Sequence, residues 1–170
     1  MNNDIAVLRR AVDDATRIIA GIAPAQLDDP TPCEDFTVRQ LVDHLSAGLD
    51  DFAVRLDGGA ASADLTWPTV GPRLAAAFEA PGALDGDLEL AYGTFPRTTV
   101  LHHALGEVAI HTADLARATG QELGDDALCE RAMQVVDDGW RMEGVLGPAL
   151  PAPAGASATE RLLAFAGRKI

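Results

Sequence analysis

The sequence predicts an all-α protein, a four-helix bundle with short extra helices towards the C-terminus. Three observations lead to this prediction. Apolar residues recur at spacings of three and four along several long segments, strand-like alternation is rare, and no internal repeat indicates a solenoid. Because 170 residues suffice for one hydrophobic core, we expect a single domain over residues 1–170.

The first two helices have clear sequence signals. Apolar side chains form one helical face between Asp4 and Ile22. A loop with two prolines and two aspartates, residues 27–32, interrupts the helical pattern. The second helix should run from Val38 to about Leu56, because Thr37 and Gln40 form the T-x-x-Q pattern of a capping box directly before it.

The remaining elements are predicted with signals of different strength. We expect a shorter third helix around Leu74–Phe78, and mostly loop over residues 83–96. A long helical pattern from about Thr98 to Thr119 ends at Gly120, the residue type that favours the left-handed conformation after a helix. The C-terminal part should contain a helix, a loop rich in Gly, Pro and Ala, and a short helix, over residues 125–140, 144–156 and 158–166.

Charge and composition narrow the classes of partner. The net charge is −13, with 26 acidic and 13 basic residues, so electrostatics oppose binding to nucleic acid or to anionic membranes. The N-terminus lacks the pattern of a signal peptide, and no apolar run approaches the roughly 18 residues of a membrane span. We therefore expect a cytoplasmic protein without nucleic-acid or membrane partners.

The two cysteines, Cys33 and Cys129, are far apart and form no CxxC pattern. This spacing argues against a disulfide framework and against a zinc site made of thiolates. Cys33 precedes the second helix closely enough to approach a site there, but a small packing residue is the favoured interpretation.

The long predicted helix carries a stripe of metal-ligand residue types. Glu107 and His111 are four residues apart, so their side chains project from one helical face, one turn from each other. At roughly 100° per residue, His103 and Asp114 fall on the same stripe, which apolar residues flank on both sides. A divalent cation would compensate a carboxylate buried beside imidazoles, so the stripe suggests a metal site inside the bundle.

A third ligand should come from another helix, and His44 is the candidate. Two alternatives remain from the residues alone: His44 as a hydrogen-bonded core histidine, and Glu107 with His111 as a surface pair. The metal interpretation gains weight because three of the four histidines lie on the helix that carries Glu107. With three protein ligands, one coordination position would stay open for a substrate.

Two residues of the stripe have further possible roles. Asp114 can accept a hydrogen bond from a ligand imidazole, the usual support for a metal-bound histidine, or it can form an ion pair with Arg117 or Arg97. His103 can be a fourth ligand, an acid or base of the pocket, or part of an exposed helix start.

Three segments resemble a known family. Thr31–Leu45 (TPCEDFTVRQLVDHL) resembles the pattern T-P-C-x-x-W-T-V-x-x-L-x-x-H-L, and Glu107–Gln121 (EVAIHTADLARATGQ) resembles E-x-x-x-H-x-x-D-L-A-R-A-T-G-Q. The ending Arg161–Arg168 (RLLAFAGR) is similar to R-L-L-A-F-x-G-R. These are patterns of actinobacterial DinB-like proteins, in the superfamily of the mycothiol-dependent maleylpyruvate isomerases.

The resemblance implies a DinB-like four-helix bundle in which His44, Glu107 and His111 bind a metal ion, usually zinc. It also implies that the open position receives a low-molecular-weight thiol such as mycothiol. Phe36 and Ala113 replace tryptophans of the family pattern, and the chain ends soon after the bundle, so we do not expect the isomerisation of maleylpyruvate itself.

Two classes of function follow. The first is an enzyme, a thiol-dependent S-transferase or isomerase that acts on a small electrophilic molecule, with the metal activating a thiol or water. The alternative is a non-catalytic metal-binding bundle that serves as a small-molecule-binding or dimerisation module, and a homodimer is possible in either case.

Overall fold

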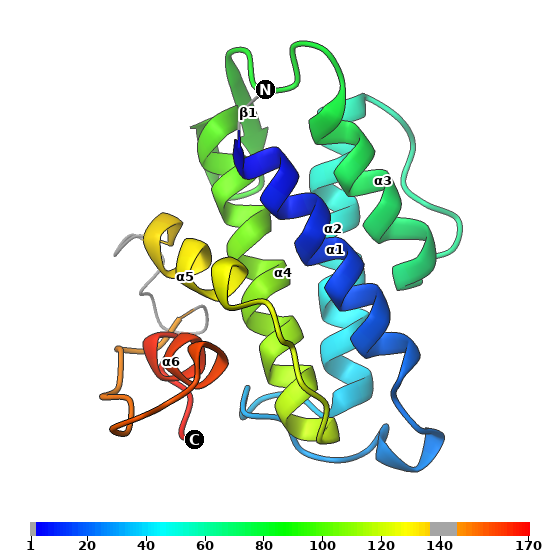
Figure 1. Ribbon diagram of the computed structural model, residues 1–170. Helices are drawn as coiled ribbons and strands as arrows, with labels where there is room; N and C mark the ends of the chain where they lie inside the picture. The colour runs from blue at the N-terminus through cyan, green and yellow to red at the C-terminus, as the bar shows by residue number, and fades with distance from the viewer. Residues whose placement is uncertain (1–2, 137–145) are drawn as a thin grey trace.

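The computed structural model describes residues 3–136 and 146–170, and the all-α prediction is confirmed (Figure 1). The elements in chain order are α1 (Asn3–Ala20), a short 3-10 helix (Pro24–Gln26), α2 (Val38–Asp57), α3 (Trp67–Glu79), β1 (Asp87–Leu90), β2 (Gly93–Pro96), α4 (Arg97–Thr119), α5 (Asp126–Val135) and α6 (Ala158–Phe165). Among the described residues, no helix is both long and apolar enough to cross a bilayer.

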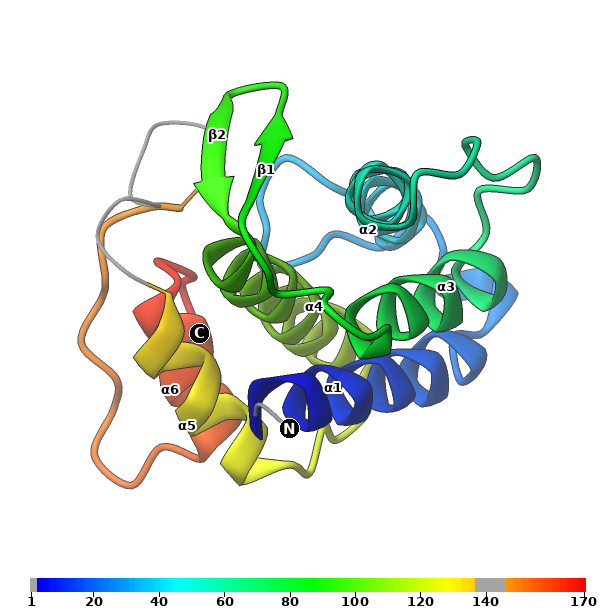
Figure 2. The same cartoon turned by 90° about the horizontal axis from the view of Figure 1, so that it is seen from above.

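The first four α-helices form the bundle. α1 packs against α3 and α4, and α2 packs against the same two helices from the other side. α5 and α6 lie outside this bundle, against α4, as the view from above shows (Figure 2). α4 is therefore covered by helices on most of its surface, and from Ala104 to Ala116 every residue except Glu107 is buried. Polar side chains on such a helix need partners inside the protein.

The predicted helix boundaries of α2 and α4 are confirmed. The hydroxyl of Thr37 accepts a hydrogen bond from the backbone N–H of Gln40, and the Gln40 side chain accepts one from the N–H of Thr37. Gly58 and Gly120 follow α2 and α4 with φ of 67° and 69°, the left-handed conformation that glycine adopts without strain.

The third helix begins earlier than predicted. α3 starts at Trp67, seven residues before the predicted Leu74, and contains Pro72. Burial explains the difference: Trp67 is almost fully buried, and its indole N–H donates to the Thr16 hydroxyl of α1. Gly71 lies one turn further on, where a Cβ atom would approach the Trp67 ring to 2.9 Å. The packing of this ring therefore holds the start of the helix in place.

The prediction of mostly loop over residues 83–96 is wrong from Asp87 onwards. β1 and β2 form an antiparallel hairpin in which Leu90 faces Gly93. Leu88 and Leu90 are buried while Asp87 and Glu89 are exposed, so a strand pattern is present over only four residues. The hairpin leads directly into α4, and the Arg97 N–H donates to the carbonyl of Gly86.

The two C-terminal helices occur near their predicted positions. α6 ends one residue before the predicted end, at Phe165. α5 ends at Val135, and the predicted continuation over residues 137–140 lies outside the described residues, as do residues 144–145 of the predicted loop.

We expect Thr37→Ala to lower the free energy of unfolding by about 1 kcal/mol, because it leaves a backbone N–H at the start of α2 without its acceptor. Urea denaturation followed by circular dichroism measures this change. Thr66→Ala is the matched control, since Thr66 precedes α3 but its hydroxyl bonds Asp64 instead of the helix backbone. Equal effects of the two substitutions would contradict the assigned role of Thr37.

Candidate metal centre

The three predicted ligands come together between two neighbouring helices. His44 projects from α2, and Glu107 and His111 project from α4. One ligand atom of each lies within 4.8 Å of the ligand atoms of the other two. The structure thus places an imidazole of α2 opposite the carboxylate and imidazole that the helical spacing had already grouped.

His111 has both ring nitrogens directed at carboxylates. Its Nε2 lies 3.3 Å from Glu107 Oε2, and its Nδ1 lies 3.2 Å from Asp114 Oδ2. The His44 ring lies edge-on to the His111 ring, with 5.4 Å between the centroids. Nε2 is therefore the ring nitrogen that faces Glu107, while Nδ1 faces the buried Asp114.

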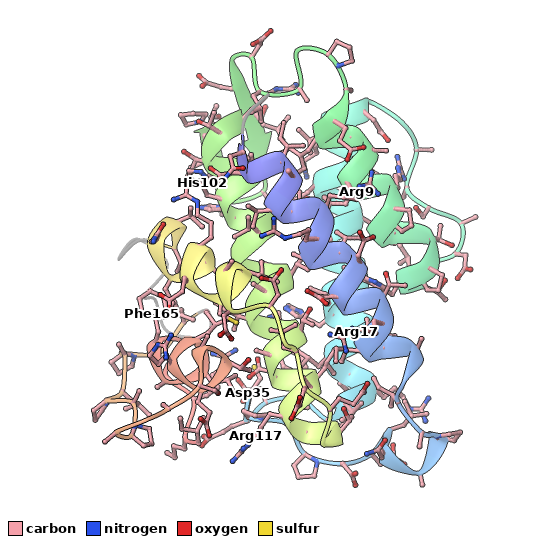
Figure 3. The ribbon with its side chains drawn as sticks, in the orientation of Figure 1. Arg9, Arg17, Asp35, His102, Arg117 and Phe165 are labelled. Carbon is pink, nitrogen blue, oxygen red and sulfur yellow. The ribbon has the colours of Figure 1, made fainter. Side chains whose placement is uncertain are left out.

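Asp114 has a second partner that the sequence did not suggest. Both of its carboxylate oxygens accept hydrogen bonds from Arg168, at 3.2 Å from Nε and 3.0 Å from Nη2. Arg97 instead donates to the carbonyl of Asp87, and Arg117 lies on the exposed surface (Figure 3). Of the two roles considered for Asp114, the structure combines both, as a support for His111 and as half of an ion pair with a different arginine.

Hydrogen bonds and neighbouring charges shift the pKa values of His111 and Glu107. Burial by itself lowers the pKa of His111, but hydrogen bonds with Asp114 and Glu107 outweigh it and raise the pKa to about 9. Burial also acts to raise the pKa of Glu107, but the His111 hydrogen bond and the nearby positive charges hold it below its usual value. Both shifts favour the charged forms, a Glu107 carboxylate beside a protonated His111.

The three residues of the candidate site differ in their exposure to solvent. His44 is exposed, Glu107 is partly buried and His111 is buried. The Phe36 ring stacks on the His44 ring, with 4.8 Å between the centroids and an interplanar angle of 27°. Partial removal from water and the neighbouring His111 lower the pKa of His44, which favours the neutral ring whose lone pair can bind a metal. A small molecule would reach the group from the His44 side.

Cys33 belongs to a second group of ligand types, together with His111 and Asp114. The hydroxyl of Thr31 lies 2.9 Å from the carbonyl oxygen of Cys33 and holds the loop that carries it. Burial raises the pKa of the Cys33 thiol, which disfavours the thiolate that a metal binds. Since Arg168 also occupies both oxygens of Asp114, this second group is the poorer candidate for a metal site.

His103 is in neither group within the described parts of the chain. Its Nδ1 lies 3.4 Å from the Tyr92 hydroxyl, and its ring lies 5.5 Å from that of Phe95. His103 therefore contacts the hairpin that the sequence analysis missed. His102, its neighbour, projects towards α1 instead (Figure 3), and its Nε2 lies 3.0 Å from Asp4 Oδ2.

The fold and this group define a class of protein, a helical bundle with a His-Glu-His group between two adjacent helices. Residues 8–91 match the family described as the mycothiol maleylpyruvate isomerase N-terminal domain, which confirms the resemblance seen in the sequence. The matched segment contains His44 and ends before Glu107 and His111.

Two relatives align over almost the whole chain. Both are uncharacterized proteins of Mycobacterium tuberculosis, one from strain CDC 1551 / Oshkosh and one from strain ATCC 25618 / H37Rv. Each is 28% identical over 179 residues, which cover 95% of this chain and 96% of the relative. No solved structure matches the chain.

We expect Asp114→Ala to destabilise the metal-free protein by about 3 kcal/mol or more, because it leaves the buried Arg168 guanidinium without its carboxylate. Urea denaturation in the presence of a chelator measures the change. Glu130→Ala is the control, since Glu130 pairs with Arg161 on the surface, where an ion pair contributes little. A stability of Asp114→Ala equal to that of the unsubstituted protein would show that the pair is not buried as described.

Proposed function

We propose that His44, Glu107 and His111 bind one divalent transition metal ion, with zinc as the ion that best suits the donor set. The observation that carries this proposal is the convergence of two imidazoles and one carboxylate within 4.8 Å, from two helices. Histidine nitrogen and carboxylate oxygen are common zinc ligands. The interior Asp114 supports the same assignment, because a metal-bound histidine usually donates its other N–H to a carboxylate.

The donor set also fits a catalytic site better than a structural one. Structural zinc sites are closed by four protein ligands, whereas catalytic sites have three and keep a position for water or substrate. In the described parts of the chain, neither His103 nor Asp114 belongs to the group of His44, Glu107 and His111. His103 contacts Tyr92 and Phe95, and Asp114 pairs with Arg168. Because His44 is exposed, its side of the group is the one from which an exogenous ligand would approach.

We further propose a thiol-dependent reaction, S-transfer or isomerisation, on a small electrophilic molecule. When bound, a zinc ion lowers the pKa of a coordinated thiol or water and supplies a nucleophile at neutral pH. The family match is the support for a thiol such as mycothiol as the cosubstrate. In this proposal His44 lies at the entrance, where it meets the incoming thiol, and His111 is held from the interior.

The protein purified without chelators should contain about one equivalent of metal, measured by elemental mass spectrometry. We expect His44→Ala and Glu107→Ala to weaken metal binding more than 100-fold, beyond the roughly 10–100-fold that changes around the ligands cause. His103→Ala is the matched control and should retain the metal. A metal-free wild-type protein, or full metal content in both ligand variants, would refute the proposed centre.

The reaction can be tested with mycothiol and a chlorinated dinitrobenzene. In this assay the sulfur–carbon bond forms, the carbon–chlorine bond breaks and chloride leaves, so the thioether is followed by its absorbance. We expect removal of the metal with a chelator, or Glu107→Gln, to reduce the rate at least about 100-fold, towards the uncatalysed reaction. Tight metal binding together with an unaccelerated reaction across a panel of thiols and electrophiles would instead favour the non-catalytic alternative.

A further inference from the structure

The chain turns back towards the bundle directly after α6. The N–H of Gly167 donates to the carbonyl of Ala164, and the N–H of Arg168 donates to that of Leu163. These two bonds form a Schellman motif, which requires a left-handed residue, and Gly167 has φ of 80°. A Cβ atom at Gly167 would also lie 3.0 Å from the carbonyl oxygen of Pro148. Glycine at this position therefore allows the turn that sends Arg168 inward.

The guanidinium of Arg168 has hydrogen bonds from three of its nitrogens. Nε and Nη2 bind the two oxygens of Asp114, and Nη1 donates to the carbonyl of Ala166 at 2.9 Å. The side chains of Arg168 and Asp114 are only 9% and 0% exposed. Apolar residues often replace such buried ion pairs without loss of stability, because removing two charges from water is costly. Stability alone is thus a weak explanation for this pair.

The pair has a direct consequence for His111. Both oxygens of Asp114 accept hydrogen bonds from Arg168, so Oδ2 acts as an acceptor towards His111 as well, and Nδ1 is the ring nitrogen that donates. Nε2 is then the nitrogen whose lone pair a metal can use. It lies on the side of Glu107 and His44, 3.3 Å from Glu107 Oε2. Arg168 therefore acts on His111 through two successive contacts, its own with Asp114 and that of Asp114 with His111.

We propose that Arg168 is a positioning residue of the metal centre. It holds Asp114 in the orientation that keeps Nδ1–H of His111 directed inward and Nε2 directed at His44 and Glu107. This inference rests on the proposed metal binding and adds a role for the C-terminal segment. The bundle helices α2 and α4 supply the ligands, while the turn after α6 sets the tautomer and orientation of one of them.

The test uses the full chain with Arg168→Gln, Arg168→Lys and the control Arg161→Gln. Arg161 lies on α6, the helix that precedes Arg168, and pairs with the exposed Glu130. We expect Arg168→Gln to weaken Zn²⁺ binding about tenfold, as changes in residues that orient metal ligands do, and Arg161→Gln to leave it within about twofold. Arg168→Lys should recover part of the loss, because lysine keeps the charge without the two-pronged geometry. Competition with a chromophoric chelator measures the affinities, and the absorption spectrum of the Co²⁺-loaded protein reports the ligand geometry.

A double substitution separates positioning from general destabilisation. If Arg168 acts through Asp114, then Arg168→Gln should change affinity by less than about twofold in an Asp114→Asn background. Lower stability with unchanged Zn²⁺ affinity and an unchanged Co²⁺ spectrum in folded Arg168→Gln would overturn the inference. If Arg168→Gln does not fold, an unchanged affinity and spectrum in Arg168→Lys and Asp114→Asn would overturn it equally. A wild-type protein that binds no metal would overturn the proposed function, and this inference with it, whereas normal binding in all variants would overturn the inference alone.

Discussion

The constraint on which this structure depends is the burial of acidic and imidazole side chains in the middle of α4. Glu107, His111 and Asp114 lie within two turns of a helix that other helices cover on most of its surface. Buried charges are costly unless they are paired. Their compensation comes from elsewhere in the chain: α2 brings His44 to one end of the group, and the segment after α6 brings Arg168 to the other. The packing of α2 and α6 on α4 thus supplies the partners that the three polar side chains of α4 need.

The fold could be predicted where local signals decide it. The capping box at Thr37 and the glycine at Gly120 depend on backbone atoms a few residues away, so their sequence patterns suffice. The start of α3 could not be predicted in this way, because Trp67 is held by the Thr16 hydroxyl of α1, 51 residues distant. The hairpin of β1 and β2 was not predicted for a different reason. Its four-residue strands are too short for their alternation of buried and exposed residues to be distinguished from a loop.

The candidate site shows the same division. Helical geometry alone grouped Glu107 with His111, and the family resemblance supplied His44 from another helix. The same geometry also placed His103 on the stripe, but the undetected hairpin puts Tyr92 and Phe95 against it. For Asp114, local reasoning suggested arginines three residues later or at the start of the helix, whereas the observed partner is 54 residues away. The signal for Arg168 was its place in the family-like ending, which gave no partner.

The arrangement of charges favours an exchangeable site over a closed one. On the inner side, His111 contacts the buried Asp114 carboxylate, which in turn accepts two hydrogen bonds from the Arg168 guanidinium. On the outer side His44 is exposed and supported by the stacked Phe36 ring. A metal ion bound here would have its His111 ligand fixed on the buried side and would be accessible to small molecules on the His44 side. Zinc sites that keep a position for substrate need this combination, because the protein must fix three ligands while a fourth is exchanged.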